Sequence, residues 1–238
     1  MALPLKEWLK TVQPMNKIPI EELQTKTFMR DPFRSRYIDD RYFLSPADGI
    51  ILYAQEMNPT EQLAEIKGVQ YTLKDIMEDQ TFDKTCLVIG IFMTFFDVHI
   101  NRIPYAGTFD WKLLPPIMSY NKPMVAEEND ILTDLTKKIY GDLSYMKHNA
   151  RMLNTIYNPW LDYTYFVTQI ADDEVNVISH FTTHKYDWFD QGQRFSFVRW
   201  GSQCELIMPI DDRFTFKTLI QKEWHVESGQ DKLVEVIK

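Results

Sequence analysis

The sequence has few cysteines, few glycines and no long apolar run. Its two cysteines form no Cys-x-x-Cys pair, which favours a reducing compartment over a disulfide scaffold. Its eight glycines form no Walker or Gly-x-Gly-x-x-Gly pattern, so the common nucleotide-binding loops are excluded. No run approaches the roughly eighteen apolar residues of a membrane span. Residues 1–11 also lack the continuous apolar region of a signal peptide.

Positive charge is in deficit as well. The formal net charge is −8, which argues against a general nucleic-acid-binding function. Hydrophobic residues make up 45% of the chain and aromatic residues 14%, a composition typical of a globular protein. The sequence shows no repeats, no low-complexity tract and no clear linker, so we expect residues 1–238 to form a single compact domain.

The N-terminus carries an apolar stripe at i, i+3, i+4 and i+7, which predicts a short amphipathic helix: Leu5, Trp8, Leu9 and Val12. Lys6 and Lys10 lie off that stripe. Two interpretations stay open. The helix docks on a membrane surface with an aromatic anchor, or it packs on the domain, which is the commoner case.

Strand patterns dominate the rest of the chain. Residues 42–44 and 50–53 flank a Pro- and Asp-Gly-containing segment that predicts a hairpin-like turn, and residues 87–92 predict a further strand. A helical stripe follows Asp130 over residues 131–139, and a weaker helical pattern continues to Leu153. We therefore predict an α+β, strand-rich fold, dominated by β-structure with peripheral helices.

A Gly-Ser pair lies between two alternating runs. Phe195 and Phe197 alternate with Ser196 before Gly201 and Ser202. After the pair, Gln203 and Glu205 alternate with apolar residues, namely Cys204, Leu206 and Met208, which predicts strands on both sides. One interpretation of the pair is an ordinary bulge. The other is self-cleavage, in which the serine oxygen attacks the preceding carbonyl and elimination leaves a pyruvoyl group. Its ketone can form a Schiff base with an amine and act as an electron sink.

Other candidates for chemistry are acids and histidines. Asp97 and His99 are two residues apart, so an extended segment would place them on one face, where the acid orients the imidazole or raises its pKa. Asp48 lies in a turn that suits aspartate for backbone reasons alone. His180 and His184 have the spacing of a metal-binding helix face, but their neighbours indicate strand, so no metal site is predicted.

Four segments in order resemble the phosphatidylserine decarboxylase family. Residues 28–32 (Phe-Met-Arg-Asp-Pro) with residues 45–49 (Ser-Pro-Ala-Asp-Gly) are similar to its first motif. Residues 66–73 resemble its Lys-Gly-x-x-Tyr-Ser-Leu segment. Residues 96–104 are similar to the Asp-Val-His-x-Asn-Arg-x-Pro block of its shorter members, and residues 192–202 resemble its self-cleavage region.

The resemblance implies a proenzyme that cleaves itself between Gly201 and Ser202. A large subunit of residues 1–201 and a small subunit of residues 202–238 would stay interwoven, with Ser202 converted to the pyruvoyl cofactor. The resemblance also implies that Asp48 takes part in self-cleavage and that His99 acts in decarboxylation. These roles suit the chemistry, since the serine needs a base and the carbon that loses carbon dioxide needs a proton.

Arg102 stands where the longer members have a second histidine. Arginine is always protonated and is a poor base, so the base for self-cleavage stays open between His99 serving both steps and Asp48 acting more directly. Arg102 is instead predicted to bind the substrate carboxylate or phosphate, for which its planar donor fork is suited.

The predicted function is decarboxylation of phosphatidylserine to phosphatidylethanolamine. The partners that follow are a phospholipid substrate, a membrane surface reached from the cytoplasm as a peripheral protein, and the two subunits of one precursor; no nucleic acid is expected. Whether the protein forms a homo-oligomer is left open. Two alternatives remain: a soluble amino-acid decarboxylase with the same pyruvoyl chemistry, and an uncleaved, non-catalytic homologue that binds a partner.

Overall fold

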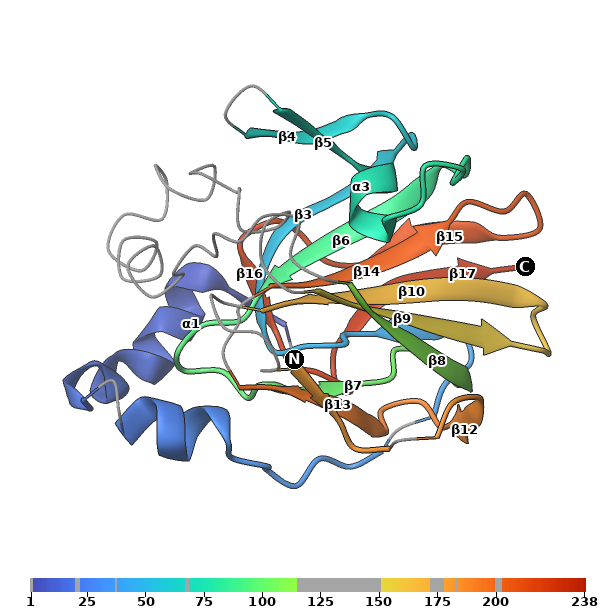
Figure 1. Ribbon diagram of the computed structural model, residues 1–238. Coiled ribbons are helices and arrows are strands. Elements are labelled where there is room, and N and C mark those ends of the chain that lie inside the picture. Colours follow the sequence, from blue (N-terminus) through green and yellow to red (C-terminus); the bar gives the residue numbers. More distant parts are fainter. Residues whose placement is uncertain are drawn as a thin grey trace.

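The structure of the chain, a computed structural model, describes residues 2–19, 22–36, 38–66, 69–114, 151–171, 178–182, 184–199 and 203–238. Strands dominate this part of the chain, and a few short helices lie around them (Figure 1). The predicted α+β, strand-rich fold is confirmed. Of the helices that the structure describes, none is long and apolar enough to cross a membrane.

A nine-stranded antiparallel sheet forms the centre of the molecule. In spatial order its strands are β1 (Leu3–Pro4), β16 (Trp224–Val226), β3 (Gly49–Met57), β6 (Cys86–Phe92), β14 (Gln203–Pro209), β10 (Tyr163–Ile170), β9 (Arg151–Asn158), β8 (Gly107–Leu114) and β12 (Asp187–Phe189). Strand β6 is buried along its whole length and confirms the strand predicted over residues 87–92. Strand β14, which follows the Gly-Ser pair, lies in the middle of the sheet.

Three smaller sheets accompany the large one. Their strands, in spatial order, are β11 (Ile178–His180), β13 (Arg194–Val198) and β7 (Ile100–Arg102); β15 (Thr215–Thr218), β17 (Lys232–Ile237) and β2 (Tyr42–Leu44); and β4 (Gln62–Ile66) with β5 (Val69–Thr72). Strands β13 and β14 confirm the strands predicted on both sides of the Gly-Ser pair. They belong to different sheets, so the chain passes from one sheet to the other between Val198 and Gln203.

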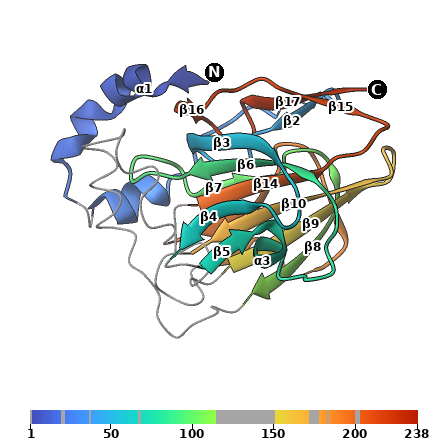
Figure 2. The ribbon, with the colours of Figure 1, turned by 90° about the horizontal axis from the view of Figure 1, so that it is seen from above.

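Short helices flank the sheets: α1 (Leu5–Val12), the 3-10 helix η1 (Gln13–Lys17), the π-helix η2 (Leu23–Phe28) and α3 (Leu73–Met77). A reciprocal capping box of Thr72 and Asp75 begins α3. The predicted N-terminal helix is confirmed as α1, beside β16 (Figure 2). Its Trp8 is only 5% exposed, so the helix packs on the domain and the membrane-anchor interpretation is wrong for this side chain.

The alternation along β14 divides its side chains between two cores. Cys204, Leu206 and Met208 pack between the large sheet and the two three-stranded sheets, whereas Ile207 faces the core beneath α3. A third cluster, which includes Trp8 and Phe28, fills the space beneath α1 and η2. A strand buried on both faces in this way holds its register tightly, because a slip of one residue would exchange the two sets.

Three local expectations were wrong or fall outside this part of the chain. Strands β2 and β3 do not pair with each other; β2 pairs with β17, and β3 pairs with β16 and β6. Residues 45–48 therefore link two sheets instead of closing a hairpin. The weak helical pattern that ended at Leu153 is wrong there, because Leu153 lies in β9. The helix predicted over residues 131–139 lies outside the described residues.

One row of paired residues crosses the large sheet at the end nearest the Gly-Ser pair. From β1 to β8 it runs Leu3, His225, Ile50, Phe92, Gln203, Ile170, Arg151 and Leu114. Paired residues in an antiparallel sheet share a face. The row therefore fixes where the chain resumes after Ser202, with Gln203 held between Phe92 and Ile170.

Candidate active site

The Gly-Ser pair itself, Gly201 and Ser202, lies outside the described residues, but both of its flanks are placed. Before it, the Val198 amide donates to the carbonyl of His99 at 3.0 Å. After it, Gln203 pairs with Phe92 and is fully buried. The predicted histidine thus lies directly against the strand that leads to the predicted cleavage point.

The imidazole of His99 is clamped on both ring nitrogens. Nδ1 lies 3.2 Å from the carbonyl oxygen of Val198, and Nε2 lies 3.1 Å from that of Thr94. Phe28 stacks on the ring with centroids 4.1 Å apart. A neutral imidazole has only one N–H, so it can satisfy only one of the two carbonyls, whereas an imidazolium satisfies both. Burial nevertheless outweighs these carbonyls and the nearby Asp97, and lowers the pKa of His99 below its usual 6.5.

Asp97 does not orient His99, which corrects the expectation from their spacing. Residues 94–97 form a turn, closed by the Asp97 amide donating to the Thr94 carbonyl, so the alternation of an extended segment does not apply. The Asp97 carboxylate accepts at Oδ2 from the amide and the hydroxyl of Thr94, both at 2.8 Å. Its other oxygen lies 2.7 Å from Nε2 of His225.

His225 is a buried residue that the sequence patterns did not single out. Burial acts to lower its pKa, but the charge and hydrogen bond of Asp97 prevail and raise the pKa above 6.5. Burial acts to raise the pKa of Asp97, but the charge and hydrogen bond of His225 prevail and lower that pKa below its usual value. Trp8 stacks on the His225 ring with centroids 4.4 Å apart. The pair is separated by 128 residues, so no local motif could have indicated it.

The predicted cleavage acid, Asp48, is buried and paired with an arginine. Arg34 donates to both of its carboxylate oxygens at 2.6 Å, and the Ser228 amide donates to Oδ1 at 2.7 Å. Arg34 also donates to the carbonyl and hydroxyl of Ser228. Among the described residues, the hydrogen bonds of Asp48 go to Arg34 and Ser228 and not to His99, although the Asp48 charge acts to raise the pKa of His99. The structure brings the two predicted residues into one region without a direct hydrogen bond.

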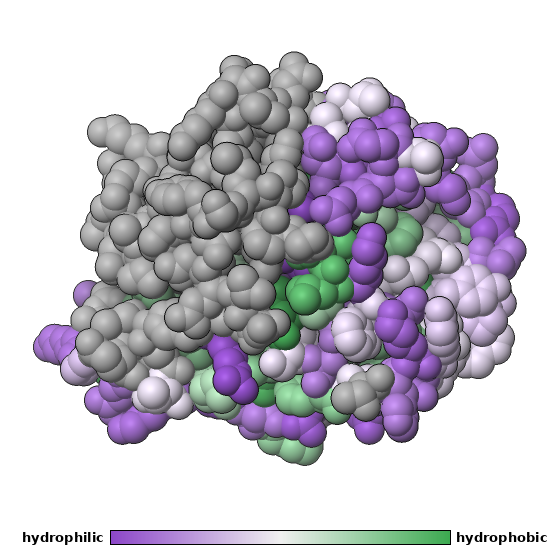
Figure 3. Space-filling view, viewed as in Figure 1, coloured by the Kyte–Doolittle hydropathy of each residue, from purple (hydrophilic) through white to green (hydrophobic). Residues whose placement is uncertain are grey.

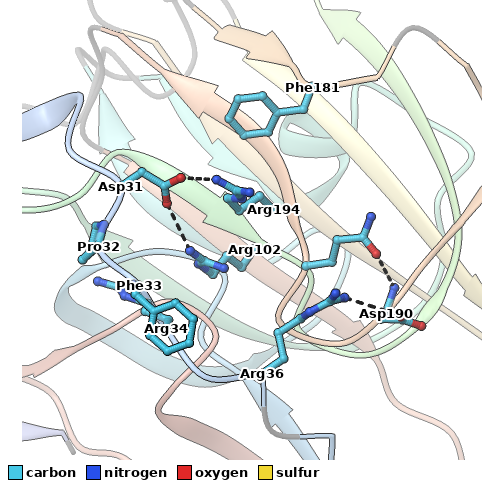
Figure 4. A pocket seen from close by; sticks show the side chains of 10 residues that line it. Asp31, Pro32, Phe33, Arg34, Arg36, Arg102, Phe181, Asp190 and Arg194 are labelled. Carbon is cyan, nitrogen blue, oxygen red and sulfur yellow. Dashed lines mark hydrogen bonds and ion pairs between the residues drawn. The ribbon is translucent and has the colours of Figure 1, made fainter.

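Arg102 lines an open cavity of about 820 Å³, which we call the arginine pocket. Its lining residues are Asp31, Pro32, Phe33, Arg34, Arg36, Arg102, Phe181, Asp190, Gln193 and Arg194 (Figure 4). Asp31 lies between two of the arginines, with Arg102 Nη2 at 3.4 Å from one oxygen and Arg194 on the other. Arg102 Nη1 donates to the carbonyl of Gly192 at 3.1 Å.

Glu205, two residues beyond Gln203, is a second titratable group that the sequence patterns did not single out. It is fully buried in the middle of β14, and the hydroxyl of Tyr53 donates to its Oε1. Burial raises the pKa of Glu205 to about 7, and the hydrogen bonds of Tyr53 and Gln203 and the charge of Arg151 only partly oppose that rise. The period of two in β14 places Glu205 on the same face as Gln203. In the sequence, the signal that could have indicated this site is a charged residue within a run of otherwise mostly apolar residues.

The histidines considered for a metal site serve other contacts. His180 ends β11, and its Nε2 lies 2.7 Å from the side-chain oxygen of Asn154, which confirms the strand interpretation for this residue. His184 is exposed beside Asp187. Within the described ranges no cluster of three or more metal-binding side chains occurs. Cys86 and Cys204 are buried, as expected for small core residues.

Comparison with known proteins identifies the family. The phosphatidylserine decarboxylase family matches residues 25–233, so the chain belongs to this family. A phosphatidylserine decarboxylase proenzyme of Novosphingobium aromaticivorans is 36% identical over 184 residues, which is 76% of this chain and 62% of that protein. Proenzymes of the same name from Carboxydothermus hydrogenoformans and Symbiobacterium thermophilum are each 26% identical and cover 85% of this chain, over 75% and 74% of their own lengths. The chain thus spans less than two thirds of the first relative and about three quarters of the other two.

Proposed function

We propose that the chain cleaves itself between Gly201 and Ser202 and decarboxylates phosphatidylserine to phosphatidylethanolamine. The observation that carries this proposal is the position of His99, a residue of the matched family region, against Val198, four residues before the serine. A large subunit of residues 1–201 and a small one of residues 202–238 would result. Asp48 and His99 belong to the first, and the serine to the second.

The residues beside Ser202 fit a pyruvoyl group. Gln203 and Ile170 are fully buried and Phe92 nearly so, which gives a water-poor site at the start of β14. A pyruvoyl group held there would supply a ketone, which can serve as an electron sink for decarboxylation of a substrate that carries an amine. Exclusion of water protects such a ketone from side reactions and strengthens the electrostatic interactions around it.

His99 is suited to serve both steps. Its lowered pKa keeps the imidazole neutral at neutral pH, so one ring nitrogen can act as a base once it exchanges its carbonyl neighbour for the serine hydroxyl. The imidazolium that forms would find acceptors ready at both nitrogens, the carbonyls of Thr94 and Val198. The same ring can later deliver a proton to the carbon that loses carbon dioxide. This favours His99 as the base that the arginine at position 102 cannot be.

Asp48 fits a positioning role in self-cleavage better than a role as the base. Both of its oxygens already accept hydrogen bonds from Arg34, and Oδ1 also accepts from Ser228. Ser228 belongs to the proposed small subunit. The carboxylate would therefore hold residues of the two subunits in register near the cleavage point, and its charge would support protonation of His99.

The proposal includes a peripheral location on the cytoplasmic side of a membrane, because the substrate is a lipid. Helix α1 does not supply the anchor, since Trp8 is buried against His225. On the face shown in Figure 3 the described surface is mostly hydrophilic, with hydrophobic residues gathered in a central patch and at the lower edge. Figure 1 places the loop that follows η2 at that edge.

Intact-protein mass spectrometry, paired with an assay of carbon dioxide release from phosphatidylserine vesicles, tests the proposal. We expect two fragments that meet at Gly201–Ser202, the smaller carrying a ketone in place of its amino terminus. Ser202→Ala should give one intact, inactive chain, because alanine has no oxygen nucleophile. Free serine as substrate separates lipid from amino-acid decarboxylation. An active preparation made only of intact chains would refute the proposal.

A further inference from the structure

We infer that the arginine pocket binds the phosphodiester group of an anionic phospholipid, with the exposed Phe33 and Phe181 at its rim contacting the apolar part of that lipid. The inference rests on the proposed function only in taking this lipid to be the substrate. The site itself is defined by the residues that line the pocket, and neither His99 nor Ser202 is one of them.

The charges of the pocket suit a monoanion. The charge of Arg34 is neutralised by its ion pair with Asp48, which does not line the pocket. The remaining charged groups of the lining are three guanidinium groups and two carboxylates: Arg36, Arg102, Arg194, Asp31 and Asp190. Three positive charges against two negative ones leave an excess of one. A phosphodiester carries one negative charge, and a planar guanidinium binds phosphate oxygens through paired hydrogen bonds. This excess stands out in a chain whose formal net charge is −8.

Arg102 carries a donor that lacks an acceptor. Its residue is 6% exposed, and its Nε is buried without a hydrogen-bond partner in the part of the chain described here. Its contact with Asp31 is long, at 3.4 Å, and the same carboxylate is shared with Arg194. Buried donors in proteins are nearly always paired. A phosphate group in the pocket would supply additional acceptor oxygens for a guanidinium that Asp31 serves only in part.

The rim of the pocket indicates that the anion is attached to an apolar molecule. Phe33 is 93% exposed and Phe181 is 57% exposed. Figure 4 shows Phe181 and Phe33 on different sides of the cluster formed by Asp31, Arg102 and Arg194. Large exposed apolar side chains next to a charged cavity mark a site for an amphiphile, whereas a site for free phosphate needs none.

The segments that form the pocket also carry the proposed catalytic site. Phe28, three residues before Asp31, stacks on His99, and Arg102 follows His99 by three residues. Arg34 holds Asp48 at two positions. A lipid whose phosphate lies in the pocket would therefore be anchored by the same two segments that hold the histidine.

Vesicle co-sedimentation of the Ser202→Ala precursor tests the site without any need for turnover. The vesicles are phosphatidylcholine with or without phosphatidylglycerol, an anionic phosphodiester lipid that is not the substrate. Arg36→Gln and Arg194→Gln should each weaken binding to the anionic vesicles by about five- to tenfold. Arg213→Gln is the matched control, since Arg213 is 50% exposed and paired with a carboxylate, as Arg194 is at 51%. Arg194→Lys should retain part of the binding, and thermal melts check that each variant is folded.

The aromatic arm distinguishes a lipid from free phosphate. Phe33→Ser and Phe181→Ser should weaken vesicle binding and leave the binding of inorganic phosphate, measured by calorimetry, unchanged; Trp160→Ser, at a side chain 77% exposed, is the control. Phosphate binding with no preference for anionic vesicles would overturn the lipid assignment. Arg36→Gln and Arg194→Gln proteins that bind like Arg213→Gln would overturn the site, even if the wild type is cleaved and active. An inactive wild type with intact, arginine-dependent lipid binding would refute the proposed reaction and leave the site standing.

Discussion

Replacing Glu205 by glutamine should make the protein more stable above neutral pH. The carboxyl group is fully buried in β14, with Tyr53 donating to one oxygen and no partner for Oε2 among the residues that the structure describes. Thr168 lies directly opposite in β10, and its hydroxyl is also unpaired there. Glutamine keeps the shape and the acceptor for Tyr53, and it adds an amide donor that can reach towards the threonine.

The magnitude follows from the pKa of Glu205, which is raised from 4.5 to about 7 by burial. A shift of that size corresponds to about 3 kcal/mol between the two protonation states. The folded state binds the proton more tightly than the unfolded state does. This contribution to stability is therefore fully present below pH 4.5, declines as the pH rises, and is lost once the pH exceeds about 7. The glutamine variant has no such group and should lack this part of the pH dependence.

Urea unfolding at several pH values between about 5 and 8 measures the free energy of unfolding. The measurement uses the Ser202→Ala background, in which we expect the chain to stay in one piece. We expect the free energies of unfolding of Glu205→Gln and its parent to be similar at the acidic end, with the variant ahead by up to about 3 kcal/mol at the alkaline end. Glu235→Gln, at a half-exposed surface pair with Lys217, should change stability by less than about 1 kcal/mol at every pH. Parallel curves for Glu205→Gln and its parent would refute the reasoning, because they would show that Glu205 does not change protonation on folding.

Three further substitutions test the candidate active site. His99→Ala should lower turnover by about 10²- to 10⁴-fold. If this variant stays intact on electrophoresis, His99 serves both self-cleavage and decarboxylation. A cleaved variant with wild-type turnover would remove His99 from the mechanism. Asp48→Asn should slow self-cleavage, because it breaks the pairing with Arg34, and normal cleavage would limit Asp48 to structure. His225→Gln should cost about 3–5 kcal/mol in unfolding free energy, because it leaves Asp97 buried without its partner. Since the pKa of His225 is raised above 6.5, that loss should be largest below pH 6.5 and shrink as the pH rises through the folded value; a loss independent of pH would contradict the charged pair.

Features encoded by local spacing were predictable from the sequence. The period of two in residues 203–206 reflects the apolar face that β14 turns to the core, and the helical stripe through Trp8 reflects one face packed on the domain. Both patterns persist in any tertiary setting that buries the apolar side. The role expected for His99 came from family resemblance, since spacing alone related it only to Asp97, and its position beside Val198 was not predicted.

Features that depend on partners far along the chain were not predictable. The segment over residues 45–48 has the composition of a hairpin turn, but β2 pairs with β17, and β3 pairs with β16 and β6. Asp97 pairs with His225 across 128 residues, and Arg34 contacts Ser228 across 194. Side chains at such separations meet only once the sheet is assembled, so no spacing rule indicates which acid serves which base. The arginine pocket shares this origin, since Asp31 meets Arg194 across 163 residues.

The same long-range contacts explain how a cleaved chain would stay in one piece. Strand β14 is hydrogen-bonded on one side to β6 and on the other to β10, both from the proposed large subunit. Strand β17 also pairs with β2 of the proposed large subunit, and a buried hydrogen bond joins Asp97 to His225 across the two subunits. Cleavage before Ser202 would break one covalent bond and none of these contacts. Because the residues that flank the serine belong to different sheets, the new ends could separate locally and open the start of β14 to substrate while both sheets keep their register.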